Sequence, residues 1–139
     1  MALIVDAGAL FAQADAEEPR HEAVARVLVA EREALVTTEL AVAEADDLIL
    51  TRLGVGVELS FLEDLAMGTY IVECLTRDEL RAAREVVEWY RDLRLGPANA
   101  SLVVLAHRYG TVVSSPSTSP PSGACPLCKA AASPSCPRT

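Results

Sequence analysis

The sequence predicts an α/β fold built around a buried parallel strand near the amino terminus. The first observation is the run Leu3-Ile-Val5, which is short, continuous and apolar, contains β-branched residues and leads directly into Asp6. Runs of this kind are typical of strands buried on both faces of a parallel sheet. The second observation is that segments with helical apolar spacing alternate with short β-prone segments along residues 20–113. That order is the one expected of an α/β domain.

Asp6 follows the first strand directly, and two interpretations of it remain open. In open α/β sheets the carboxyl ends of the strands carry the chemistry, so Asp6 is the first candidate site residue. Aspartate is also a preferred N-cap residue, and a short helix is expected from Gly8. Position alone does not separate a site role from a cap.

Composition places the chain among globular proteins. Its 139 residues are 51% hydrophobic and 23% charged, which suits one domain with a real core. No apolar run approaches the roughly 20 residues of a membrane span, and no signal-peptide pattern is present, so we expect a soluble cytoplasmic protein with no membrane contact.

The first 113 residues hold all 20 acids against ten arginines, a net charge of −10. This balance argues against broad non-specific nucleic-acid binding, but not against a nuclease whose acids hold metal ions.

The remaining elements follow from apolar spacing and from start and stop residues. We expect helices over 20–31, 39–52, 57–67, from Thr76 and from Pro97, and strands over 34–36, 69–72 and from Thr111. Thr37 and Thr38 are helix-start residues, and Gly54 and Gly56 end the helix that follows. Thr76-Arg-Asp-Glu79 is a capping-box pattern, and Pro97 is favoured in a first turn.

Glu44 is the second candidate site residue. At 100° per residue it lies between Leu40 and Leu48 on one helix face. A carboxylate among leucines is costly unless a metal or a proton-acceptor role compensates. The alternative is a glutamate at the edge of the apolar stripe with its head in water. Asp46 and Asp47 are interpreted as solvated helix charges.

Two later segments carry further polar candidates. The helix from Thr76 is dotted with arginines at 77, 81, 84, 91 and 94, interleaved with acids. This is usually a solvated face with i,i+4 pairs, and a weak RNA-contact role is the alternative. Asn99 lies in or just before the first turn of the last helix. In its structural interpretation, Asn99 accepts hydrogen bonds from the free N–H groups at the start of that helix.

From Ser114 to the end the composition changes. Residues 114–139 contain six of the eight prolines, seven of the nine serines and no acid, so we expect a disordered tail after a domain that spans residues 1–113. Cys125, Cys128 and Cys136 lack a fourth ligand for a structural zinc site, and their role stays open. Cys74 is expected to be a small core residue.

These features together resemble the PIN-domain ribonucleases, specifically the VapC toxins of bacterial toxin–antitoxin pairs. The matching segments are Leu3-Ile-Val-Asp6-Ala, Ala41-Val-Ala-Glu44-Ala-Asp46 and Leu95-Gly-Pro-Ala-Asn99-Ala-Ser-Leu-Val-Val-Leu-Ala106. The resemblance implies a three-layer α/β/α fold with a central parallel sheet. It also implies acids that bind Mg²⁺ or Mn²⁺ and hydrolyse RNA phosphodiester bonds. Asp6 and Asn99 would be metal ligands, and Glu44 a ligand through water or a proton acceptor.

Three departures from the family pattern accompany the resemblance. Asn99 stands where the family normally has an aspartate, so one negative charge is missing. Gly8 stands where the family usually has Ser or Thr. The last strand and its further acid are replaced after Val113 by the Ser/Pro/Cys tail, so the last strand is expected to be missing or altered. The tail resembles an out-of-frame reading of a GC-rich coding sequence, which suggests a degenerate or frameshifted carboxyl terminus.

Two functions follow from the resemblance. The first is a metal-dependent endoribonuclease toxin with RNA as its substrate, a small VapB-type antitoxin as its partner and a homodimer as its assembly. The second is a catalytically impaired PIN-like protein that retains only antitoxin binding, which Asn99 and the missing fourth acid favour. A receiver-type regulatory domain would need a late lysine, and residues 1–113 have none.

Overall fold

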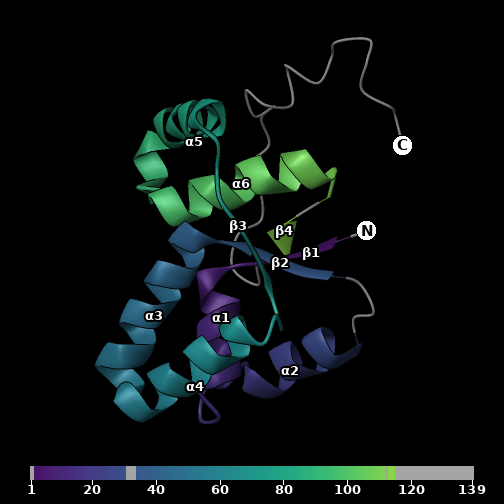
Figure 1. Ribbon diagram of the computed structural model, residues 1–139. Helices are drawn as coiled ribbons and strands as arrows, with labels where there is room; N and C mark the ends of the chain where they lie inside the picture. Colours follow the sequence, from purple (N-terminus) through teal and green to yellow (C-terminus); the bar gives the residue numbers. More distant parts are fainter. Residues whose placement is uncertain (1, 31–33, 112, 115–139) are drawn as a thin grey trace.

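A computed structural model describes residues 2–30, 34–111 and 113–114 (Figure 1). Strands and helices alternate, which confirms the predicted α/β class. The elements are β1 (Ala2–Val5), α1 (Ala7–Ala14), α2 (His21–Ala30), β2 (Ala34–Thr38), α3 (Glu39–Leu53), α4 (Val55–Ala66), β3 (Ile71–Glu73), α5 (Arg77–Trp89), the 3₁₀ turn η1 (Arg91–Leu93), α6 (Pro97–Tyr109) and β4 (Val113–Ser114). None of the helices in these described ranges has the length and apolar character that a membrane crossing requires.

The four strands form one parallel sheet in the order β3-β2-β1-β4. Leu3 is opposite Leu35, and Val36 is opposite Ile71. The expected fourth strand is present as a two-residue strand beside β1, with Ser114 opposite Val5. Ser114 is the first residue assigned to the tail from the sequence, and the expected disorder of residues 115–139 lies outside the described residues. Because all pairs are parallel, the carboxyl ends of the strands meet at one edge.

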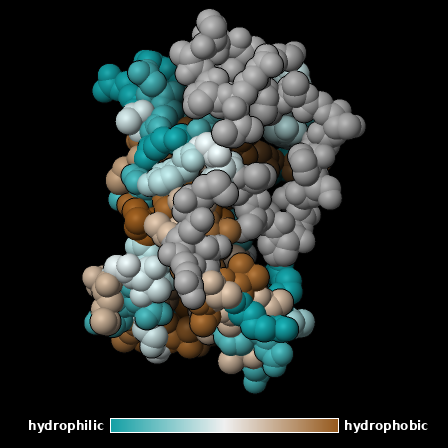
Figure 2. Space-filling view, turned by 90° about the vertical axis from the view of Figure 1, so that its right-hand side faces the viewer, coloured by the Kyte–Doolittle hydropathy of each residue, from teal (hydrophilic) through white to brown (hydrophobic). Residues whose placement is uncertain are grey.

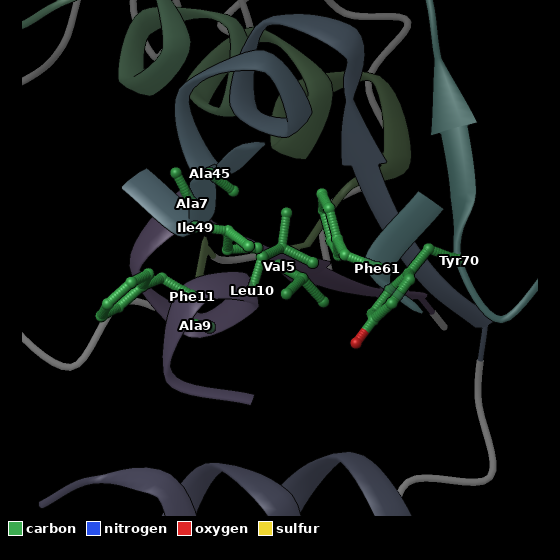
Figure 3. Close-up of a cluster of buried hydrophobic side chains, with 9 residues drawn as sticks. All are labelled: Val5, Ala7, Ala9, Leu10, Phe11, Ala45, Ile49, Phe61 and Tyr70. Atoms are coloured by element: carbon green, nitrogen blue, oxygen red, sulfur yellow. The ribbon is translucent and has the colours of Figure 1, made fainter. Parts of the chain in front are cut away.

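Successive residues of β1 point to opposite faces of the sheet, and each face has its own apolar cluster. Ile4 packs toward α6 in a cluster with Val36 and Leu105. Val5 packs on the other face, in the cluster that Figure 3 shows, where side chains of α1, α3 and α4 meet it. Helices therefore cover both faces, and the predicted three-layer α/β/α arrangement is confirmed (Figure 1).

Helix α5 packs against α6. A third cluster joins the two helices, with Ala83 and Val86 of α5 against Ala100 and Val104 of α6. The outer face of α5 is polar, and hydrophilic atoms gather at the top of the view in Figure 2, at the level of α5 in Figure 1. The capping box predicted at Thr76 is present, since its hydroxyl and its N–H both bond to Glu79.

Candidate functional site

The candidate site lies at the carboxyl edge of the sheet, where three helices begin. Helix α1 starts directly after β1, and α3 starts directly after β2. The Thr37 hydroxyl donates a buried hydrogen bond of 2.9 Å to the carbonyl oxygen of Val5, which ties the ends of these two strands together. The first turn of α6 joins them through Ser101, whose Oγ lies 2.7 Å from Oγ1 of Thr38. The starts of α1, α3 and α6 are thereby held at one edge.

Asp6 is buried at this edge, and it caps α1. Its Oδ1 accepts a hydrogen bond of 2.7 Å from the N–H of Ala9. The cap interpretation is therefore correct, but it occupies only one carboxylate oxygen. Within the described part of the chain Oδ2 of Asp6 has no hydrogen-bond partner. The two interpretations are compatible: one oxygen holds the helix and the other remains available to a cation.

Thr38 and Ser101 form a buried hydroxyl chain whose direction follows from its partners. Thr38 Oγ1 accepts from the N–H of Ala41 at 3.1 Å, and Ser101 Oγ donates to the carbonyl oxygen of Ala98 at 2.6 Å. Because the Ser101 proton is used in that bond, Thr38 must donate to Ser101. Both side chains are fully buried. The chain fixes the first turn of α6, which carries Asn99, against the start of α3.

Sequence reasoning did not find this pair. Thr38 was interpreted only as a helix start, and Ser101 was not singled out. The sequence signal for the pair is that Ser101 directly precedes the apolar run 102–106 in this helix, since a hydroxyl group buried among apolar residues requires a partner.

Asn99 is exposed in the first turn of α6. The N-cap of this helix is Gly96, which supplies no side-chain hydrogen bond. The side chain of Asn99 makes no hydrogen bond to the described residues either. The interpretation of Asn99 as a residue that satisfies free N–H groups is therefore wrong, and its amide faces the solvent beside the site.

Glu44 is exposed on α3, so of the two interpretations the structure supports the glutamate with its head in water and not the one that points inward among leucines. The buried residues of α3 are Ala41, Ala45 and Ile49, a stripe rotated by one residue from Glu44. Small alanines allow α3 to approach its neighbours closely, which a stripe through Leu40 and Glu44 would prevent. A metal or proton-transfer role of Glu44 remains a prediction, now for an exposed side chain.

Two other expectations require correction. Asp46 is half-buried rather than solvated, and its Oδ1 is buried with no hydrogen-bond partner among the described residues. Cys74 is exposed rather than part of the core. It follows the edge strand β3, where a hydrogen bond to Glu39 raises the pKa of its thiol.

The donor atoms suit a hard divalent cation held by few protein ligands. Asp6 supplies a carboxylate oxygen and Asn99 can supply a neutral carbonyl oxygen, and Mg²⁺ commonly binds one or two carboxylates with water and substrate phosphate filling the rest. No group of three His, Cys, Asp or Glu side chains able to hold a metal occurs among the described residues. The donor set is therefore sparse and carries little negative charge.

Gly8 borders the same carboxylate. A Cβ atom at this position would lie 3.5 Å from Oδ1 of Asp6, which is an ordinary contact distance. A serine or threonine would fit here and place its hydroxyl beside the carboxylate. The glycine leaves that space to solvent.

No family model matches the chain. Over 109 residues it is 42% identical to Ribonuclease VapC26 of Mycobacterium tuberculosis, which covers 78% of this chain and 81% of that protein. Its fold is similar to the crystal structure of Mycobacterium tuberculosis VapC20, described as a sarcin-ricin-loop-cleaving toxin, with a TM-score of 0.73 and 16% identity over 80% of this chain and 85% of the other.

Proposed function

The chain belongs to the VapC ribonucleases, and from this premise we propose that it is a metal-dependent endoribonuclease that hydrolyses RNA phosphodiester bonds. The observation that carries the proposal is that the two carboxylate oxygens of Asp6 differ in their contacts. A buried carboxylate at the carboxyl edge of a parallel sheet holds helix α1 with one oxygen and leaves the other without a partner. The α/β/α fold shared with VapC20 supports the same placement of the site.

Each site residue has a role in the proposal. Asp6 would hold Mg²⁺ or Mn²⁺ with its carboxylate, and Asn99 would contribute its carbonyl oxygen from the first turn of α6. Glu44 would accept the proton of the attacking water or hold the cation through a water molecule. A bound divalent cation would polarise the phosphate and lower the pKa of water at the site. The hydrogen bond between Thr38 and Ser101 holds the start of α6, which carries Asn99, against the start of α3. The hydrogen bond from Thr37 to the carbonyl oxygen of Val5 holds the end of β1, which precedes Asp6, beside the end of β2.

The sparse donor set favours a second candidate function. Because Asn99 is neutral and the described residues contain no three-ligand acidic group, a protein with impaired catalysis that only binds its antitoxin is the alternative. Both candidates use the same site, and they differ in whether it still cleaves RNA.

Protein partners belong to the proposal as well. Apolar side chains of α3 and α4 are exposed at Leu50, Val55, Leu59 and Leu62. Exposed apolar residues that gather on neighbouring elements are typical of protein interaction surfaces. We expect a small VapB-type antitoxin and a second copy of this chain as the partners.

A cleavage assay tests the function. Purified full-length protein is incubated with a structured RNA and Mn²⁺, beside Asp6→Asn and Asn99→Asp variants. Asparagine keeps the cap on α1 but removes the charge, so we expect Asp6→Asn to fold normally and lose at least about 100-fold in cleavage rate. Asn99→Asp restores a charged ligand, and we expect it to bind Mn²⁺ more tightly and to cleave faster.

The control is Asp47→Asn, which removes an exposed acid of α3. We expect its cleavage rate to equal that of the wild type. If the wild type does not cleave RNA and Asn99→Asp does, the protein is catalytically impaired, as the second candidate function states. If Asp6→Asn cleaves as fast as the wild type, Asp6 does not hold the metal and the site assignment fails.

A further inference from the structure

The arginines around α5 fall into two groups that the sequence did not separate. Arg81 pairs with Asp78 at 2.7 Å and Arg84 pairs with Glu88 at 3.0 Å, both on the exposed face of α5. These charges are neutralised within their own helix.

Arg91 and Arg94 form the second group. Both side chains are exposed, and neither makes an ion pair or hydrogen bond with the part of the chain that the structure describes. Arg77 has no ion-pair or hydrogen-bond partner within the described ranges either, but it starts α5 at the opposite end of that 13-residue helix, about 20 Å away.

The two unpaired arginines project from one short turn next to the candidate site. Arg91 begins η1, and Arg94 is its C-cap. Arg91 and Arg94 are three residues apart, so both belong to this one short turn of the chain. Arg94 is two residues from Gly96, the N-cap of α6, so the two Cα atoms are at most about 7.6 Å apart. Asn99 follows in the first turn of the same helix.

The backbone at Arg94 is also unusual. It adopts a left-handed conformation with φ of 50°, and it is the one non-glycine residue with positive φ among the described residues. Glycine adopts this conformation without the steric penalty of a side chain. The Arg94 side chain makes no contact that would explain its presence as packing, since it is exposed and unpaired. Neither packing nor ion pairing therefore explains why an arginine occupies this position, and we look for the explanation in its positive charge.

We propose that Arg91 and Arg94 bind the phosphodiester backbone of the RNA next to the cleavage site. This inference rests on the proposed ribonuclease function and assigns its substrate contact. Residues 1–113 hold 20 acids against ten arginines, so the body of the protein as a whole repels a polyanion. Two unpaired guanidinium groups next to the candidate site offset that repulsion locally, because arginine binds phosphate through paired N–H donors.

RNA binding without cleavage tests the contact directly. The binding of a fluorescein-labelled single-stranded RNA of about 12 nucleotides to the full-length protein is measured by anisotropy in EDTA, over a series of salt concentrations. We expect the variant Arg91→Gln/Arg94→Gln to bind about tenfold more weakly at low salt. We also expect the slope of log K against log salt to fall by about 1.4, since each single-strand phosphate contact contributes about 0.7.

The matched control is Arg81→Gln/Arg84→Gln, which removes the same formal charge from the same region. We expect it to match the wild type in both affinity and slope, because its arginines are already paired. Equal losses in the two double variants would show a general charge effect and overturn the proposal.

Arg94→Gly separates binding from stability. Glycine relieves the left-handed backbone, so we expect the melting temperature not to fall while RNA affinity decreases. A decrease in affinity without a decrease in stability excludes misfolding as the cause. Unchanged affinity would remove Arg94 from the contact.

The cleavage assay distinguishes failure of this inference from failure of the proposed function. Cleavage by the wild type with an unchanged salt slope in Arg91→Gln/Arg94→Gln would overturn only the arginine contact. The opposite result is also possible. If Arg91→Gln/Arg94→Gln binds RNA more weakly, while neither the wild type nor Asn99→Asp cleaves RNA, the ribonuclease function is rejected and the RNA-binding surface is retained.

Discussion

The carboxylate of Glu79 shows how one residue joins three elements. Oε1 and Oε2 accept hydrogen bonds of 2.7 and 2.6 Å from the guanidinium of Arg108 in α6, and Oε2 also accepts from the N–H of Thr76 at 2.8 Å. Arg108 reaches further, to Glu73 at the end of β3, at 3.0 Å. These hydrogen bonds, above all those from Arg108, lower the pKa of Glu79 from 4.5 to about 2.

The lowered pKa predicts a pH-dependent stability. A carboxyl group with a lower pKa in the folded state stabilises that state above its unfolded pKa, and the contribution is lost as the pH falls through the folded pKa. We expect Glu79→Gln to lower the free energy of unfolding by about 1–2 kcal/mol at pH 7, allowing for partial solvent screening. The difference from the wild type should shrink between about pH 4.5 and pH 2.

Chemical denaturation of both proteins across that pH range measures the effect. Asp78→Asn is the control, because Asp78 makes only an exposed pair with Arg81. We expect its effect to stay below about 1 kcal/mol. A difference between Glu79→Gln and the wild type that stays constant down to pH 2 would mean that the ion pair is not the source.

At the scale of elements, the chain reversal between α3 and α4 depends on a single residue. Gly54 ends α3 and begins α4, with φ of 88° and ψ of 174°. This region of backbone space is essentially restricted to glycine. Because no other atom lies within 4 Å of a Cβ built there, the restriction comes from the backbone and not from packing.

Replacing Gly54 should therefore destabilise the hairpin of α3 and α4. We expect Gly54→Ala to lower the free energy of unfolding by about 1–3 kcal/mol, measured by urea denaturation. Gly56 is the matched control, since it lies within α4 and a Cβ there also meets nothing within 4 Å. We expect Gly56→Ala to raise stability by up to about 1 kcal/mol. The same sign for both substitutions would refute the backbone argument.

For the whole molecule, the sheet separates two apolar layers. Ile49 of α3 is fully buried in the cluster around Val5, and Leu105 of α6 is fully buried in the cluster around Ile4. The two clusters share no residue, and the helices that contribute to them lie on opposite sides of the sheet (Figure 1).

This separation predicts that the two layers contribute independently to stability. We expect Ile49→Val to lower the free energy of unfolding by about 0.5–1.5 kcal/mol and Leu105→Ala by about 2–5 kcal/mol. In the double variant the two effects should add within about 0.5 kcal/mol. A coupling above about 1 kcal/mol, measured by denaturation of all four proteins, would mean that the layers respond as one core.

The sequence predicted local features well. The strand before Asp6, the capping box at Thr76 and the helix start at Pro97 depend on residues within about four positions, where backbone preferences and capping bonds act. Predictions of side-chain burial were less accurate, because they depend on which other element packs against a residue. The environments predicted for Asp46 and Cys74 are wrong, and Glu44 takes the solvent-facing one of its two alternatives. The reason is that helix periodicity and local apolar composition do not say which element packs on a residue.

The sequence by itself determined the order of the elements, the position of Asp6 directly after a buried strand and the resemblance to the VapC toxins. Only the tertiary structure decided that Asp6 caps α1 with one oxygen and leaves the other without a partner among the described residues. It also decided that Thr38 meets Ser101, 63 residues away. The physical reason is range: capping and periodicity act over a few residues, whereas burial and the pairing of buried hydroxyl groups depend on segments that meet only in the folded chain.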